Sequence, residues 1–181
     1  MLARGEAVRP AIPPEPPKEG PTADELSIPA EVLDAASSTK LVALVQQSQT
    51  QRINVAQKFE DVFEILVTGG RADEYTALCD RFSTRFGALS RNLEMCAARL
   101  SGEPALATMV QDVNASEAKR LELQMELQVV RQRLSLAEVE SEDAAGGKQR
   151  VTALEGELKA LTGQIYESLE ELRCEAADLE D

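Results

Sequence analysis

The sequence predicts an all-α protein: an antiparallel helical hairpin followed by a long pair of helices, an elongated bundle or coiled coil, with a disordered N-terminal tail. Two observations support this fold class. Apolar residues recur every three or four positions from about residue 41 to residue 179, which is the period of an α-helix. Only 3% of the residues are aromatic, which favours narrow aliphatic seams over a thick multilayered core.

Residues 1–36 are predicted to be a disordered, proline-rich tail. Seven of the eight prolines lie in this stretch, and each removes a backbone donor and holds the preceding residue extended. The sparse apolar side chains are not expected to offset the entropy cost of ordering the chain. The run from Ile12 to Pro17 favours polyproline II geometry, but a linker or leader is the simpler interpretation, and we assign it no function.

Residues 38–102 are predicted to form the helical hairpin. Ser37 or Ser38 suits the N-cap of the first helix, and Gly69 and Gly70 supply the backbone freedom that ends it. The second helix carries the most regular apolar stripe, with steps of three and four residues throughout: Tyr75, Cys79, Phe82, Phe86, Leu89, Leu93, Cys96 and Leu100. Such regularity predicts one buried face along the whole helix.

Residues 103–181 are predicted to form a long antiparallel helix pair, an acidic coiled coil. Pro104 suits the first turn of the third helix. That helix runs to about Ser141 and, at about 1.5 Å per residue, should project from a small globule. A loop ending at Gly146 and Gly147 separates it from a fourth helix. Because this loop is short, the two helices are expected to pair with each other, although the pattern also allows pairing between chains in a homo-oligomer.

The residue types present exclude the commonest catalytic designs. The chain has no histidine, so it can form no His–Zn site, no Ser–His or Cys–His nucleophile and no imidazole acid–base pair. Helical di-iron sites need inward glutamates with histidine partners, and no P-loop or dinucleotide motif is present. We therefore predict that the protein is not an enzyme and has no catalytic residue, no metal site and no cofactor.

Charge is distributed unevenly along the chain. The net charge is −13, and residues 103–181, with eight basic and 18 acidic residues, account for −10 of it. An acidic chain repels phosphate backbones, so we expect protein partners, basic ones above all, and no direct binding to nucleic acid or membranes. The three cysteines form neither a disulfide framework nor a zinc motif. This favours a reducing compartment, the nucleus or the cytoplasm.

One basic ridge is predicted on the second helix. Arg81, Arg85 and Arg99 fall near one edge of its apolar stripe when successive residues are placed ~100° apart. Together with Lys119 and Arg120 of the third helix, they are the candidate partner-binding residues. The ridge could contact phosphates or an acidic protein, but ordinary salt bridges along the flanks of the helices would explain the same residues.

The segment at positions 118–132, AKRLELQMELQVVRQ, resembles the corresponding helix of the required-for-excision 1-B family of DNA-repair proteins. The hairpin before it resembles that family's first two helices in order and approximate spacing, at Gln51, Arg52, Phe59, Glu60, Phe63 and Leu66 and then at Tyr75, Leu78, Phe86, Leu89 and Ser90. The resemblance covers about residues 40–135. It implies a small, helical, non-catalytic protein connected with excision repair of damaged DNA, and it offers no catalytic motif to transfer.

Two functions remain open at this point. The first is an accessory or scaffold protein in DNA excision repair, nuclear or both nuclear and cytoplasmic, in which the hairpin binds one partner and the acidic arm presents a second surface. Recognition would then be helix on helix. The alternative is a cytoskeletal or ciliary structural coiled-coil protein, in which long helices serve as spacers. The periodicity of the sequence does not separate the two.

Overall fold

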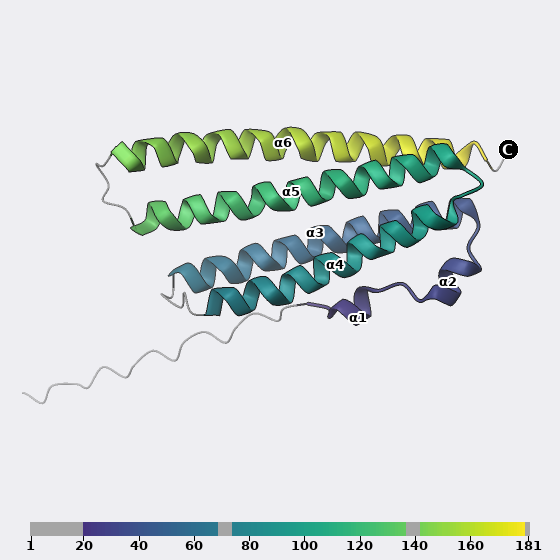
Figure 1. Ribbon diagram of the computed structural model, residues 1–181, viewed down its shortest axis with the longest axis horizontal. Coiled ribbons are helices and arrows are strands. Elements are labelled where there is room, and N and C mark those ends of the chain that lie inside the picture. The colour runs from purple at the N-terminus through teal and green to yellow at the C-terminus, as the bar shows by residue number, and fades with distance from the viewer. Residues whose placement is uncertain (1–19, 69–73, 137–141, 180–181) are drawn as a thin grey trace, which may run out of the picture.

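The computed structural model describes residues 20–68, 74–136 and 142–179, and within these ranges all regular structure is helical. Two short helices, α1 (Ala23–Leu26) and α2 (Ala30–Asp34), precede four long ones, α3 (Ser38–Thr68), α4 (Tyr75–Arg99), α5 (Pro104–Leu136) and α6 (Glu142–Ala177). The long helices run side by side, with α6 at one edge and the short helices at the other (Figure 1). The all-α prediction, the hairpin and the antiparallel distal pair are confirmed.

The two helices of the hairpin match their predicted boundaries closely. The first helix begins at Ser38. Six of the eight stripe residues predicted for the second helix are buried, including Leu100 directly after α4, and Tyr75 and Cys79 are half-buried. Pro104 is the first residue of α5, as predicted. The predicted turn at Gly69 and Gly70 lies outside the described residues.

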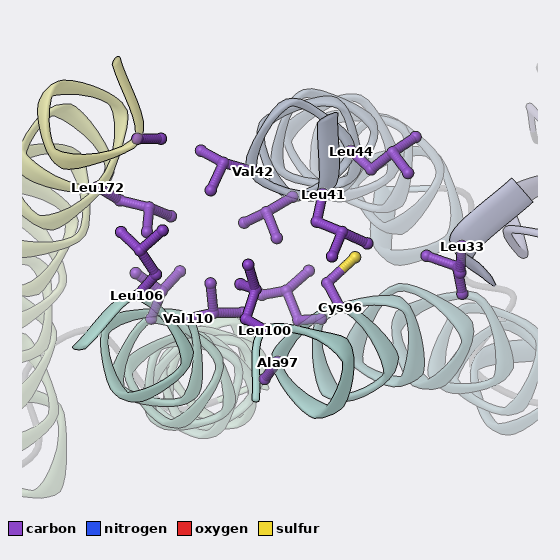
Figure 2. Packing of buried hydrophobic residues seen from close by; sticks show 14 residues of the cluster. Leu33, Leu41, Val42, Leu44, Cys96, Ala97, Leu100, Leu106, Val110 and Leu172 are labelled. Carbon is purple, nitrogen blue, oxygen red and sulfur yellow. The ribbon is translucent and has the colours of Figure 1, made fainter. Parts of the chain in front are cut away.

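One apolar cluster, where α4 turns into α5, draws side chains from five helices. It joins Leu33 of α2, Leu41 of α3, Leu93 of α4, Leu106 of α5 and Leu172 of α6. Figure 2 shows the side chains of this cluster lying between the helices. A cluster of this kind closes the α5/α6 pair onto the hairpin within one chain. The prediction that the third helix projects is therefore wrong, because α5 packs against α3 and α4 as well as against α6.

The rest of the core divides into two smaller clusters. The first lies between α3 and α4 and is rich in aromatic rings, including Phe59, Phe63 and Phe82. The second lies between α5 and α6 and has three buried leucines: Leu123, Leu127 and Leu154. The distal half of the long pair is thus held by the narrow aliphatic seam that the composition predicts.

Residues 20–36 depart from the predicted disordered tail. A capping box between Thr22 and Glu25 starts α1, and Leu26 and Leu33 are 2% and 1% exposed against the hairpin. The segment has few apolar residues on average, but two of them are deeply buried leucines, and polar contacts to α4 hold the chain beside them. Their burial offsets the entropy cost of ordering the segment. The remainder of the predicted tail, residues 1–19, lies outside the described residues.

The predicted loop at positions 141–147 also needs correction. Helix α6 begins at Glu142, so Gly146 and Gly147 are helical. A Cβ atom at Gly147 would lie 2.6 Å from Cδ2 of Leu134 on α5. Glycine at this position therefore serves a close helix–helix contact rather than a turn, and sequence reasoning mistook it for a helix breaker.

Candidate functional site

The structure does not bring the predicted basic ridge together on the surface. Arg85 is buried, with its guanidinium carbon 4.6 Å from the ring centroid of Phe82, a cation–π geometry. An Arg99 guanidinium nitrogen lies 2.6 Å from the carboxylate of Asp34 on α2. Arg81 is exposed. The salt-bridge interpretation thus holds for Arg99, and its partner, Asp34, comes from the segment predicted to be disordered. Arg85 instead belongs to the core.

Lys119 and Arg120 both pair with carboxylates on their own helix. Lys119 Nζ lies 3.1 Å from Glu122, and an Arg120 guanidinium nitrogen lies 2.8 Å from Glu117. The first pair is 60% and 70% exposed and contributes little to stability. The second is mostly buried, and it leads into a polar cluster that connects three helices.

Arg52 of α3, Ser90 of α4, and Glu117 and Arg120 of α5 form this cluster, called the Arg52 cluster below. Arg52 Nε lies 4.0 Å from Glu117 Oε2, with side-chain exposures of 2% and 3%, and Arg52 Nη2 donates to Ser90 Oγ at 3.1 Å. Arg120 Nε donates to the same Glu117 oxygen at 2.9 Å. Burial lowers the pKa of Arg52, and the charge of Glu117 opposes that shift. One carboxylate therefore serves two guanidinium groups, and it is the electrostatic link between α3 and α5.

A second polar contact joins the same two helices further along. Glu60 of α3 accepts hydrogen bonds from Gln124 and Gln128 of α5, at 2.7 and 3.2 Å. Two separate polar contacts of this kind fix both the register and the rotation of α5 on α3, because a shift of either helix would leave buried polar groups without partners.

Sequence reasoning missed Arg52 and Glu117 as a pair, since 65 positions separate them. The sequence nevertheless contains a pattern that indicates buried charges at these two positions. Arg52 falls on the helical spacing of the buried residues Val45, Val55 and Phe59, and Glu117 on that of Val110 and Val113. A charged residue on an otherwise buried stripe requires a buried partner of opposite charge.

Asn92 of α4 holds the N-terminal segment in place. Its side chain is fully buried, accepts from the backbone N–H of Ile28 at 3.0 Å and donates to the carbonyl of Leu26 at 2.8 Å. An amide that pairs with both a backbone donor and a backbone acceptor recognises an extended strand of chain. The contact explains why residues 26–28 lie against α4.

Two hollows open between α4 and α5. One, of about 210 Å³, lies beside Leu93 and Glu94 on α4 and is lined on α5 by Gln111, Asn114, Ala115 and Ala118. The other, of about 20 Å³, is almost wholly apolar and is lined by Phe59, Cys79, Phe82, Ser83, Phe86, Leu121 and Met125. On each helix the two sets of lining residues continue one another at helical spacing, so the hollows lie along one line, called the α4/α5 groove below.

Residues that could hold a metal do not converge in the described ranges. No group of three or more Cys, Asp or Glu side chains there has the geometry of a metal site, and this part of the chain includes the acidic residues Glu167, Glu170, Glu171, Glu175 and Asp178 of the C-terminal region. No helix among the described residues has the length and apolar character needed to cross a membrane.

The fold and the site define a class of protein: a helical bundle with a buried ionic cluster between three helices and an open groove between two of them. A family model described as DNA repair REX1-B matches residues 40–131, a range that contains nearly all of α3, the whole of α4, the Arg52 cluster and both hollows of the groove. The match spans just over half of the chain, and the protein therefore belongs to the DNA repair REX1-B family, as the resemblance predicted. Comparisons with curated proteins and with solved structures gave no match.

Proposed function

We propose that this protein is a non-catalytic accessory or scaffold protein in DNA excision repair, acting through helix-mediated contacts with other proteins in the nucleus, or in the nucleus and the cytoplasm. The observation that carries the proposal is the family match, because the family is named for DNA repair and the matched range covers the centre of the bundle. The proposal goes beyond that name in assigning a scaffold role, protein partners and a location.

The buried polar groups favour a binding role over a catalytic one. Arg52, Glu117, Asn92 and Glu60 each bond to another segment of the same chain, so they act in holding helices together. A general acid or base needs a free proton-transfer path to a substrate in a shielded cleft. These side chains instead make a rigid frame on which helix surfaces are presented.

The surface charge favours protein partners over DNA. Four of the five basic residues expected to meet a partner interact within the chain: Arg85 with Phe82, Arg99 with Asp34, Lys119 with Glu122 and Arg120 with Glu117. The chain as a whole carries a net charge of −13. Binding to DNA depends on cations that displace counterions from phosphates. A protein that positions repair factors, and leaves contact with the lesion to them, fits this surface better.

The test is the rate at which lesions disappear from genomic DNA in cells that lack this chain, compared with the same cells rescued by the full sequence. We expect slower removal without the chain and recovery on rescue. Unchanged removal would contradict the proposal. It would favour the cytoskeletal or ciliary structural role, which would then be tested by the location of a tagged chain before and after damage.

A further inference from the structure

We propose that one face of the α3/α4 hairpin is a peptide-binding site, which residues 22–34 occupy as a releasable strap and which takes an acidic peptide of the same pattern from a partner protein. The inference rests on the proposed function as a scaffold, and it names the surface and the chemistry of the partner. The strap itself shows what the site recognises, because it lies along α4 in the free chain (Figure 1).

The site recognises the backbone of the strap through one amide side chain. Asn92 accepts a hydrogen bond from the N–H of Ile28 at 3.0 Å and donates to the carbonyl of Leu26 at 2.8 Å. Between these two residues Ser27 is extended, with φ −74° and ψ 135°. Ser48 of α3 accepts from the same Asn92 nitrogen at 3.4 Å. The site therefore holds a short extended segment by its main chain, as peptide-binding sites commonly do.

Side chains at both ends of the extended segment supply specificity. Leu26 joins the aromatic cluster of the hairpin and Leu33, seven positions later, joins the cluster of five helices. Asp34 follows directly and pairs with Arg99 of α4 at 2.6 Å. The pattern that fits the site is thus two leucines seven positions apart, an extended link between them and a carboxylate after the second leucine.

Charge on the two sides is complementary. The strap has four acidic residues and no basic one, whereas α4 has four arginines against two acidic residues, a net charge of +2. In a chain whose net charge is −13, α4 is therefore a local exception. Long-range attraction of this kind favours an acidic ligand over a basic one.

The strap has no stable structure apart from the site. Helix α1 has four residues and α2 has five, and helices this short do not persist alone in water. Only residues 35–37 connect α2 to α3. The strap therefore becomes ordered on the hairpin in the way that a disordered peptide becomes ordered on its receptor.

The site does not depend on the strap for its own construction. Removal of the strap takes one buried side chain from each of two clusters, and the rest of each cluster comes from the long helices. The family match over residues 40–131 contains Ser48, Asn92 and Arg99 and excludes the strap. Segments with few buried contacts open without global unfolding, so the site can be uncovered while the bundle stays folded.

The first arm of the test uses a fluorescent synthetic peptide of residues 20–36 as the probe. In the unmodified chain the tethered strap competes at an effective concentration of about millimolar. Leu26→Glu should release the strap, because it places a carboxylate in an apolar position, and it leaves the site itself unchanged. We expect this variant to bind the probe about tenfold more tightly than the unmodified chain, or better.

Val32→Glu is the matched control for this arm. It makes the same charge change in the same segment, but Val32 is 44% exposed, so the strap should remain bound and the probe should bind no better than to the unmodified chain. A probe that itself carries Leu26→Glu should not bind either protein.

Two further substitutions, made in the Leu26→Glu chain, test the site. Asn92→Ala should weaken probe binding about tenfold or more, because it removes both hydrogen bonds to the peptide backbone. Arg99→Glu should weaken binding several-fold, and a probe with Asp34→Arg should recover it, because opposite charges then face each other again. A change in the probe cannot repair a folding defect in the protein, so this recovery reports contact at the site.

Hydrogen exchange of the unmodified chain tests release without any substitution. The N–H of Ile28, which is bonded to Asn92, should exchange about tenfold faster, or more, than the N–H groups in the middle of α4, because the strap opens while the helix stays folded. Equal rates would mean that the strap leaves only when the whole protein unfolds, and would overturn the proposal.

Three binding results would also overturn it: no gain of probe binding in Leu26→Glu, an equal gain in Val32→Glu, or no recovery with the Asp34→Arg probe. Sedimentation equilibrium of the unmodified chain supplies a further check on the occupant. A dimer that excess probe dissociates would assign the site to the strap of a second copy of this chain instead of to a partner protein.

Rescue experiments separate this inference from the proposed function. In cells lacking the chain, Leu26→Glu should restore lesion removal, because its site is open to the partner, and the same chain with Asn92→Ala should not. Full restoration by both would mean that repair does not use the site, while the repair role stands. If absence of the chain has no effect on removal, the repair role fails, and the probe still decides whether the site binds a peptide.

Discussion

The α3/α4 hairpin and the distal half of the α5/α6 pair are held together by different means. In the hairpin, the ring centroids of Phe59 and Phe82 lie 5.1 Å apart and those of Phe63 and Tyr75 lie 5.5 Å apart. Each pair joins α3 to α4 within a broad apolar cluster. In the distal pair, three buried leucines are flanked by exposed ion pairs, Arg131 with Glu155 at 2.9 Å and Arg150 with Glu126 at 2.7 Å.

This difference indicates where stability is concentrated. Buried aromatic pairs add about 0.5–1.5 kcal/mol beyond the area they bury, whereas exposed ion pairs add at most about 1 kcal/mol and lose part of that in salt. The distal ends of α5 and α6 should therefore open more readily than the hairpin, as regions with few buried apolar contacts do. The predictions below test this contrast.

The largest expected effect is the loss of a leucine from the shared core. Leu93 and Leu154 are both fully buried, but Leu93 lies in the cluster of five helices and Leu154 in the narrow distal seam. We expect Leu93→Ala to cost about 4–5 kcal/mol and Leu154→Ala about 2–3 kcal/mol, because a thin seam can collapse around the missing atoms. Urea unfolding followed by circular dichroism measures both; equal costs would refute the contrast.

Removal of the central carboxylate should have the next largest effect. Glu117→Gln leaves the charges of Arg52 and Arg120 without a counterion at a buried site, which should cost about 3 kcal/mol or more. Glu155→Gln breaks an exposed pair between α5 and α6 and should stay within about 0.5 kcal/mol. Chemical denaturation gives the free energy of unfolding of the two variants. A cost below about 1 kcal/mol for Glu117→Gln would show that the Arg52 cluster contributes little to stability.

A smaller and more local effect is expected at Asn92. Asn92→Ala removes both hydrogen bonds to the Leu26–Ile28 backbone, which should cost about 1–3 kcal/mol. Because α1 and α2 pack on α4 through few other polar contacts, hydrogen exchange should speed up at residues 20–36 well before it does in α3 or α4. Uniform loss of protection throughout the chain would mean that the segment is an integral part of the core.

The fold was largely predictable because helical periodicity and helix ends are local properties. Ser38, Pro104 and the regular stripe from Tyr75 to Leu100 each act within a few residues of their own position, so their spacing is enough to place α3, α4 and the start of α5. The burial of Leu26 and Leu33 was not predictable in this way, since it depends on Asn92 and on a hairpin far along the chain.

The candidate site was less accessible to sequence reasoning. The Arg52 cluster joins three helices, and nothing within a few residues of Arg52 or Glu117 marks the other as its partner. Arg85 was misplaced for a related reason: a helical wheel gives the angle of a residue but not the neighbour that covers it, and Phe82 together with the packed hairpin buries Arg85. The groove likewise arises from the way α5 lies on α4, which no local pattern encodes.

The smallest effects concern the glycines of α6, and they distinguish the beginning of this helix from its middle. Gly156 and Gly163 are exposed, and a Cβ atom there would meet nothing within 4 Å, whereas at Gly147 it would meet Leu134 at 2.6 Å. Alanine at either exposed position should stabilise the protein by about 0.5–1 kcal/mol, because it favours the helix over the unfolded chain at no steric cost. Gly147→Ala should give no gain or a small loss, since the same helical preference is offset by displacement of Leu134. Thermal unfolding of the three variants ranks them, and an equal gain at all three positions would mean that α5 and α6 are not closely packed at the end where Gly147 lies.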